Sequence, residues 1–258
     1  MKRFFVWFLI GSLVVVTASD VHYYAGLQHN YQVKEASSPT MVFLSALRGT
    51  QKKATLPDGT TVWLNAASSL AYPADISEGN RTVELFGEAF FDVPHQASHP
   101  FKVRARDMLI EVLGTRFDVR NYPDEIQSRV SVSAGAIRVC YHDQLATLHP
   151  GDAVAVEPAA LTGKVFTFRS DEDTTAVTGW TKGLLSYKDR DLPSLVRELS
   201  RVYNVDIQLN GPVSDHRFDG TLSVQEPLEE VIERLIVPYS HARITRPASN
   251  RIVITVAH

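Results

Sequence analysis

Side chains able to do chemistry are few and scattered in this 258-residue chain. Cys140 and His142 are two positions apart, so on a strand they would share a face, where the histidine could activate a thiolate nucleophile. A single cysteine on a strand is more often inert packing, which is the interpretation we favour. A thiol-dependent hydrolase is therefore the third hypothesis for function. The lone cysteine also excludes an internal disulfide and any multi-cysteine metal cluster.

Two neighbouring sets of polar residues suggest binding rather than catalysis. His95 and His99 have the spacing of a metal-ligand pair on a helix, but the prolines at 94 and 100 bracket them and predict a solvated loop. Three cations then follow on one face of a predicted strand. They would either hold an acidic partner or form the wet face of an edge strand. These cations are Lys102, Arg104 and Arg106.

Other signatures of chemistry are missing from the sequence. It contains no Gly-rich phosphate loop, no nucleophile elbow, no His-Glu-x-x-His pair of zinc ligands and no paired-acid motif. We therefore expect no enzyme, no cofactor and no metal site. The 26 Lys and Arg residues against 29 Asp and Glu residues give a formal charge of −3, so no basic excess exists to neutralise a phosphate backbone. We expect no nucleic-acid partner.

The N-terminal residues carry the features of an export segment. Met1-Lys2-Arg3 precede an apolar run at 4–16, and no charge follows until Asp20. The uncharged stretch, at 1.5 Å per residue, spans roughly 24 Å as a helix, less than the ~30 Å hydrocarbon core. An anchor would need interfacial residues up to Tyr24, whereas small residues at 16 and 18 suit a cleaved signal. Either interpretation of residues 1–24 places the rest of the chain outside the cytoplasm.

The elements after this segment predict two unlike modules. Residues 25–53 have little periodicity and predict a tether, with one strand near 41–47. Short alternating segments separated by turns then predict a β domain at 54–168, with a sandwich, barrel or solenoid-like architecture. One of those turns is Pro57-Asp58-Gly59-Thr60.

A polar linker at 171–175 separates the β domain from an α+β domain at 180–258. Its predicted order is β-α-β-β-α-β-β, with both helices covering one sheet face. Each helix has one apolar stripe, and the first begins near Asp191 and Pro193. The stripes contain Leu192, Leu195, Val196, Leu199, Val202 and Tyr203 in the first helix, and Leu228, Val231, Ile232, Leu235 and Ile236 in the second.

The motifs of the β region resemble the FecR domain in family order. They are LPDGTTVWLN at 56–65, SLAYP at 69–73, GEAFFDV at 87–93, PFKV at 100–103, VLGTRFDV at 112–119 and VSAGAIRV at 132–139. Residues 183–256 resemble the C-terminal domain of the Bacteroidetes-type members, which is related to the secretin/TonB N-terminal signalling domain (STN). Together the resemblances cover about four-fifths of the chain and imply a mainly β fold with a C-terminal α+β domain.

The resemblance implies a function in signalling across the envelope. Similar proteins are single-span inner-membrane regulators whose cytoplasmic segment binds an extracytoplasmic-function (ECF) sigma factor. Their periplasmic part senses the signalling domain of a TonB-dependent outer-membrane transporter. For this chain it implies a periplasmic body held by residues 4–24, or a soluble periplasmic protein if the signal is cleaved.

Partner binding by strand addition would use an exposed sheet edge. Our candidate edge is the strand near 217–222, where Phe218 and Leu222 would either anchor the partner or pack under the helices. The candidate residues are Arg217, Phe218, Asp219, Gly220, Thr221 and Leu222.

One departure from the family pattern affects the expected role. Members carry some tens of residues of sigma-binding segment before the span, whereas this sequence has Met1-Lys2-Arg3. Three residues cannot form a binding surface of ~800 Å². We expect that the true start lies upstream, that the cytoplasmic part is a separate polypeptide, or that this copy lost it. The alternative function is an exported β-rich scaffold or glycan-contacting protein without a signalling role.

Overall fold

The computed structural model describes residues 40–77, 79–142, 144–157, 166–170, 173–213, 216–239 and 241–256. The predicted anchor or signal at 1–24 lies outside these residues, as does most of the predicted tether. Within the described part of the chain, no helix combines the length and the apolar character needed to cross a membrane. Residues 39–258 form one compact unit.

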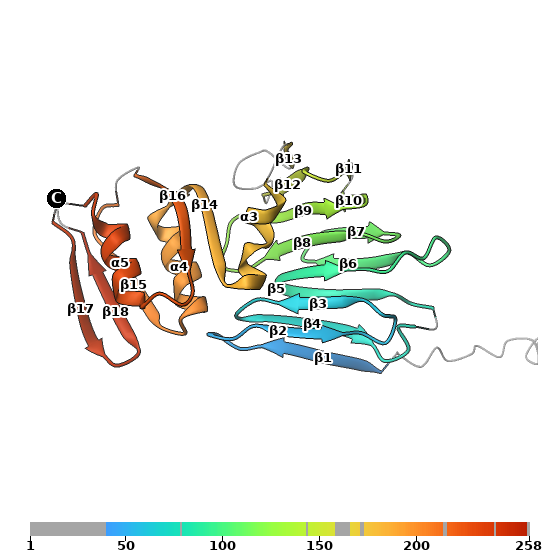
Figure 1. Ribbon diagram of the computed structural model, residues 1–258, viewed down its shortest axis with the longest axis horizontal. Coiled ribbons are helices and arrows are strands. Elements are labelled where there is room, and N and C mark those ends of the chain that lie inside the picture. The colour runs from blue at the N-terminus through green and yellow to red at the C-terminus, as the bar shows by residue number, and fades with distance from the viewer. Residues whose placement is uncertain are drawn as a thin grey trace, which may run out of the picture. The chain divides into compact units, whose positions relative to one another are not determined.

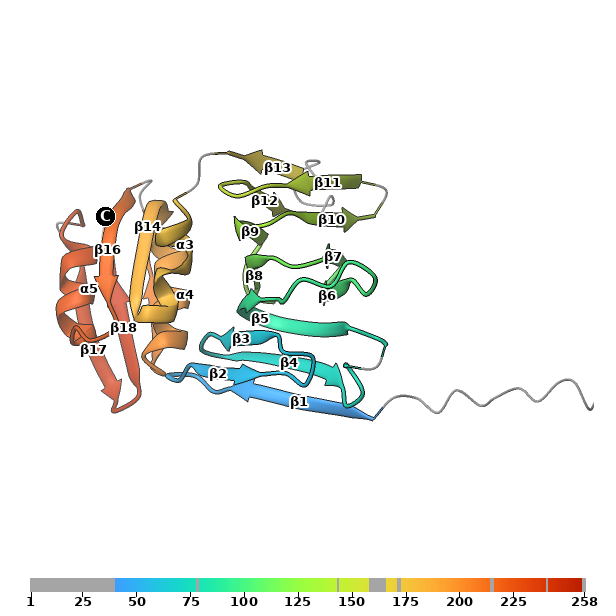
Figure 2. The same cartoon turned by 45° about the vertical axis from the view of Figure 1, so that its right-hand side comes forward.

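Thirteen strands of the described residues make one hydrogen-bonded sheet that is folded into two layers (Figures 1 and 2). The long strand β5 (Thr82–Asp92) belongs to both layers. The first layer also contains β1 (Met41–Ala46), β4 (Ser68–Pro73), β6 (Phe101–Ala105), β7 (Met108–Val112), β10 (Ile137–Tyr141) and β11 (Gln144–Leu148). The second contains β2 (Lys52–Thr55), β3 (Thr61–Leu64), β8 (Arg116–Asn121), β9 (Ser128–Ala134), β12 (Ala153–Val156) and β13 (Phe166–Arg169).

β5 passes from one layer to the other at Gly87. Its first half pairs with β4 and β6, and its second half pairs with β3 and β8. Gly87 has φ +92°, and a Cβ there would lie 2.4 Å from the Ser68 Oγ. Glycine is required at this bend because any side chain would meet both backbone strain and a close neighbour.

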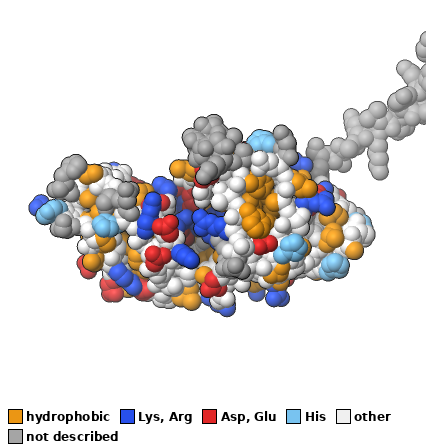
Figure 3. All heavy atoms as spheres, turned by 90° about the horizontal axis from the view of Figure 1, so that it is seen from above, with side chains coloured by type: hydrophobic (Ala, Val, Ile, Leu, Met, Phe, Trp, Pro, Cys, Tyr) orange, Lys and Arg blue, Asp and Glu red, His pale blue; other side chains and the backbone are white. Residues whose placement is uncertain are grey.

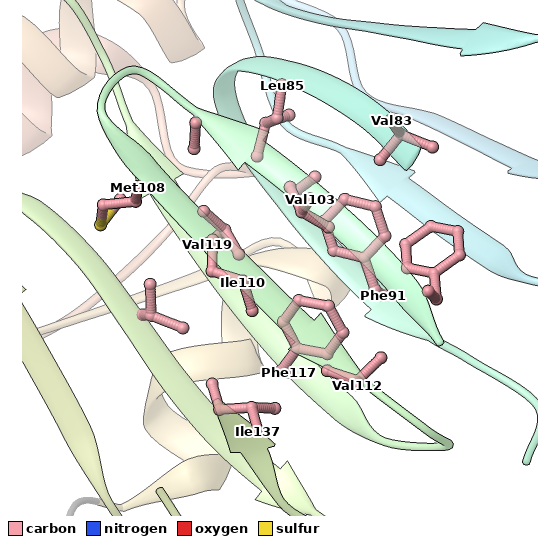
Figure 4. Close-up of a cluster of buried hydrophobic side chains, with 14 of the residues drawn as sticks. Val83, Leu85, Phe91, Val103, Met108, Ile110, Val112, Phe117, Val119 and Ile137 are labelled. Carbon is pink, nitrogen blue, oxygen red and sulfur yellow. The ribbon is translucent and has the colours of Figure 1, made fainter. Parts of the chain in front are cut away.

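The interior between the layers is apolar and fully enclosed. Phe91 stacks on Phe117 with ring centroids 5.0 Å apart and meets Phe101 of the first layer at 5.9 Å. In Figure 4, Val103 and Ile110 of the first layer point toward the same interior as these rings. Alternating strands with one buried face explain this packing. The predicted mainly β fold class is confirmed.

The predicted turn at Pro57-Asp58-Gly59-Thr60 is present and forms a buried clamp. The Asp58 carboxylate accepts hydrogen bonds from the Thr60 amide (3.0 Å) and hydroxyl (2.9 Å). It also accepts one from Arg81 Nε at 2.9 Å, and both charged side chains are almost fully buried. The aspartate of this motif therefore holds the turn and neutralises a core arginine.

The second module follows the predicted order, and its elements are short. They are α3 (Thr174–Thr178), the 3₁₀ helix η1 (Gly179–Lys182), β14 (Leu184–Asp191), α4 (Leu192–Val202), β15 (Asp206–Asn210), β16 (Arg217–Ser223), α5 (Leu228–Ile236), β17 (Arg243–Ala248) and β18 (Arg251–Thr255). Asp191 caps α4 by accepting from the Ser194 amide at 2.8 Å, as the Asp-x-Pro signal suggests. Both predicted apolar stripes face one hydrophobic cluster, to which all five strands contribute buried or half-buried residues.

Three structural predictions need correction. The five strands form two sheets, β14-β16 and β15-β18-β17, rather than one, because alternation predicts strands but not their pairing. The polar linker at 171–175 includes the start of α3, where Asp173 caps the Thr175 and Ala176 amides. A five-residue helix is too short to show a period. Within the described residues the predicted tether contains β structure, because the expected strand near 41–47 is present as β1 and β2 begins at Lys52.

Candidate functional site

The structure does not bring the predicted thiol pair together. Cys140 is half-buried near the end of β10. His142 lies beyond the end of that strand with φ +49°, and its ring packs edge-on against Tyr141 at 4.3 Å. The shared strand face predicted for Cys140 and His142 is therefore wrong, because a turn interrupts the alternation between them.

The histidine loop and the cation stripe have ordinary structural settings. His95 and His99 are exposed in a loop, as predicted, and His99 Nδ1 contacts the Ser98 hydroxyl at 2.8 Å. Among the residues with described positions, no group of three or more His, Cys, Asp or Glu could hold a metal. Lys102 and Arg104 lie on β6, which pairs with β5 and β7, so the edge-strand interpretation is wrong. Arg106 lies beyond the end of β6 and donates to the Tyr122 carbonyl at 3.2 Å. Lys102 pairs with Glu111 at 2.8 Å.

The candidate partner-binding strand, β16, is an edge of a two-stranded sheet. It pairs with β14, and no other strand of the described residues pairs with it. Leu222 is 1% exposed and belongs to the module's core, and Phe218 packs half-buried against that core and against Tyr187 at 6.0 Å. These two residues therefore pack inside the module. Arg217, Asp219 and Thr221 have exposed side chains.

The free hydrogen-bonding groups of β16 can be located from its ladder. The Val224 amide donates to the Gly183 carbonyl at 2.9 Å, and hydrogen-bonded pairs alternate along an antiparallel ladder. Leu222 and Gly220 therefore point their backbone groups toward β14, whereas Thr221 points its amide and carbonyl outward. A chain added to this edge would pair with Thr221.

A second site was not predicted and lies on the outer face of the second layer, where the α+β module covers it. Glu88 on β5 is directly opposite Arg120 on β8, and Asp118 lies one step along the same face. Alternation places these three side chains outward, because Phe117 and Val119, which alternate with Asp118 and Arg120 along β8, point into the core. All three lie on interior strands, and the two carboxylates are only 4% exposed.

Arg120 is the centre of this cluster. Its guanidinium donates to Glu88 (3.0 Å) and to both oxygens of Glu125 (2.8 and 2.7 Å), which belong to the same module. It also donates to both oxygens of Glu198 on α4, at 3.2 and 3.0 Å. One guanidinium thus pairs with three carboxylates, a geometry that its planar fork of donors allows.

Arg201, one turn after Glu198 on α4, makes a second contact between the modules. It donates to both oxygens of Asp124, at 3.0 and 2.8 Å, and to Glu125. Its guanidinium carbon lies 3.7 Å from the Tyr122 ring centroid, and that of Arg120 lies 5.2 Å from the same ring. We call Glu88, Asp118, Arg120, Glu125, Glu198 and Arg201 the charged junction.

Hydrogen bonds at both ends of the charged junction complete the contact. Trp180 of η1 donates its indole N–H to Asp118 at 3.0 Å. The Gly49 amide donates to the Arg201 carbonyl at 2.8 Å, and Arg48 donates to the Ser200 carbonyl at 2.8 Å. Figure 2 shows α3 and α4 next to β8 and β9, and α3 contacts β9.

Burial sets the ionisation of these groups. It raises the pKa of Glu88, although the charge of Arg120 opposes the rise. Burial also raises the pKa of Asp118 well above its usual range, and the charge of Glu88 adds to it. For Glu125 burial is outweighed by the charge and hydrogen bond of Arg120, which lower its pKa to about 2. The cluster is therefore built around the ion pair of Glu125 and Arg120.

The hydrogen bonds and ion pairs of this arrangement join the two modules. A signal for it exists in the sequence, since Asp118 and Arg120 alternate with core residues within one interior strand. What covers such a face cannot be read from the strand itself. Figure 3 shows acidic and basic side chains interspersed over the surface, beside a patch of hydrophobic ones, in keeping with the near-neutral composition.

Comparisons with known proteins match both modules. A family model described as "FecR protein" matches residues 44–138, and one described as "FecR, C-terminal" matches residues 184–239. Two crystal structures of a "putative anti-sigma factor" from Parabacteroides distasonis ATCC 8503 are similar to the chain. The structure at 2.50 Å resolution is 31% identical with a TM-score of 0.77, covering 85% of this chain and 100% of that one. The structure at 1.65 Å is 32% identical with a TM-score of 0.76, covering 84% and 100%. No curated protein matches the sequence.

Proposed function

This chain belongs to the FecR family, and from that membership we propose that it receives signals from a TonB-dependent outer-membrane transporter for an ECF sigma factor. The family and the similar structures support an anti-sigma or sensor role, and the family is regulatory rather than typically enzymatic. The observation that carries the proposal is the presence of both family domains, in order, on one chain.

We further propose that the transporter's signalling domain binds the free edge of β16. This edge offers the outward amide and carbonyl of Thr221, with the exposed Arg217 and Asp219 before it on the same strand. Backbone hydrogen bonds to an added strand would give affinity, and the two charges would contribute to selecting the partner. Leu222 is buried in the module's core and Phe218 is half-buried against it, so we assign both to holding the strand in place rather than to contacting the partner.

The test is a binding titration of the full chain with the isolated N-terminal signalling domains of TonB-dependent transporters from the same genome. In Thr221→Pro the outward N–H is lost while the edge strand tolerates the ring, so binding should weaken at least about tenfold. The matched control Thr221→Val keeps the N–H and should bind like the original chain. No binding by the original chain at high micromolar concentration contradicts the proposed partner. Equal binding by both variants contradicts the edge.

For location, we propose a periplasmic body that follows the export segment at 1–24. The support is the basic start followed by the apolar run, together with the family's regulatory role. N-terminal sequencing of the mature protein distinguishes an uncleaved anchor, which keeps Met1, from cleavage after Ala18. Recovery of the chain in the cytoplasm with its N-terminus intact contradicts export.

A further inference from the structure

The two modules meet at the charged junction, and each has a core of its own. One hydrophobic cluster fills the space between the β layers, and a separate cluster fills the α+β module. The large apolar side chains that the β module adds to the second cluster are Trp63 and Phe90, both half-buried. Neither module therefore depends on the other to bury most of its apolar surface.

Most charges of the junction keep a partner if the modules separate. Arg120 pairs with Glu88 and Glu125 inside the β module, at 3.0 and 2.7 Å. Glu198 pairs with Arg190 inside the α+β module, at 3.7 Å. Arg201 differs, because both carboxylates that pair with it, Asp124 and Glu125, belong to the other module. Separation thus also breaks the hydrogen bonds from Arg120 to Glu198 and from Trp180 to Asp118, but Arg201 is the arginine whose ion pairs all lie across the contact.

The composition of the contact also favours release. Burying ion pairs costs desolvation that offsets much of their attraction, so a charged contact holds less firmly than an apolar one of the same size. Interfaces between domains that move are accordingly more polar than permanent ones. Here six ionisable side chains take part in the contact, together with the aromatic rings of Tyr122 and Trp180, whereas the core of a permanent interface is depleted of charged residues.

We infer that the charged junction is a reversible docking surface, from which the α+β module releases as a unit within the native protein, with Arg201 as the clamp that holds it closed. The inference concerns the junction alone and does not depend on which partner binds β16. It predicts that the contacts at both ends of the junction are lost together, while the β layers and the α+β core stay folded.

Two N–H groups at opposite ends of the junction report its opening. The Gly49 amide bonds to the Arg201 carbonyl at 2.8 Å, and the Trp180 indole N–H bonds to the Asp118 carboxylate at 3.0 Å. The Val119 amide, on an interior strand of the β core, reports unfolding of that core. The Leu199 amide in α4 does the same for the second core.

The experiment is hydrogen exchange of the full chain in native buffer, followed by NMR. We expect Gly49 and Trp180 to share one protection factor, at least about 100-fold below those of Val119 and Leu199. Arg201→Met should lower the protection of both reporters together by a further factor of at least about 10, because it removes the charged hydrogen bonds to Asp124 and Glu125, and it should leave Val119 and Leu199 unchanged. The matched control Arg197→Met, one turn earlier on α4, should leave both reporters as they were.

Three outcomes overturn the inference. Equal protection of the reporters and the core amides means that the modules separate only on global unfolding. Unequal protection of Gly49 and Trp180 means that each frays locally. An Arg201→Met chain with unchanged reporters means that Arg201 does not hold the junction closed. A failed binding titration at β16 affects none of these results, so the two proposals fail separately.

Discussion

At the scale of single residues, carboxylates in the junction respond to burial in opposite ways. Burial raises the pKa of Asp118 well above its ordinary value of 3.8, whereas Arg120 lowers that of Glu125 to about 2. Folding therefore takes up a proton at Asp118. Its contribution to stability is present in full below pH 3.8 and is lost as the pH rises through the raised pKa. Glu125 has a lowered pKa, so its contribution to the stability of the folded state is present at neutral pH and is lost as the pH falls toward 2.

Asp118→Asn tests this assignment. The amide oxygen can still accept the Trp180 indole N–H, and no charge is buried beside Glu88, Arg120 and Arg129. We expect the variant to be more stable than the original chain at pH 8. The difference should shrink as the pH approaches 4, at a rate of up to about 1.4 kcal/mol per pH unit. Urea unfolding across this pH range measures it.

The control for this prediction is Asp92 at the end of β5, the strand that pairs with the strand of Asp118. Asp92 pairs with Arg116 at an exposed site, so Asp92→Asn should change the free energy of unfolding by less than about 1 kcal/mol at any pH in the range. If the Asp118→Asn chain were less stable than the original at pH 8, the Asp118 carboxylate would be ionised in the folded protein and would stabilise it. That result would contradict proton uptake at this carboxyl on folding.

At the scale of elements, the sequence predicts the helices, turns and strands that depend on neighbouring residues in the chain. The apolar stripes of α4 and α5, the Asp58 turn and the alternation of most strands are visible in the residues themselves, and the structure confirms them. Strand pairing is not visible in the residues, because one alternating segment can pair with many neighbours. In the structure β16 pairs with β14, and β15 pairs with β18 in a separate sheet. The Arg201 face of α4 is polar, so its burial against the β module has no hydrophobic signal.

The bend of β5 at Gly87 gives an element-scale prediction. Gly87→Ala meets both a positive φ and the Ser68 side chain, so it should lower the free energy of unfolding by roughly 3 kcal/mol. Gly151→Ala is the matched control, since Gly151 has φ +88° but no atom within 4 Å of an added Cβ. Its cost should be backbone strain alone, about 1 kcal/mol. Equal costs in urea unfolding would show that the close approach to Ser68 does not fix the bend.

At the scale of the whole molecule, the free edge and the charged junction are physically connected. Arg190 of β14 lies opposite Phe218 of β16 in the ladder and reaches Glu198 of α4 at 3.7 Å. Glu198 in turn pairs with Arg120 of the β module at 3.0 Å. A strand added beside β16 would extend the sheet that carries Arg190, and we expect binding there to shift the junction toward its open state.

The central claim is that the free edge of β16 receives the signal and that the junction opens in response, and hydrogen exchange at Gly49 and Trp180 in the presence of the partner tests it most directly. With a saturating signalling domain, we predict that the protection of both reporters falls by about tenfold, a coupling of about 1.4 kcal/mol. The Thr221→Pro chain, mixed with the same domain, should show no change. Protection that stays constant or rises when the domain is demonstrably bound to the original chain would contradict the claim.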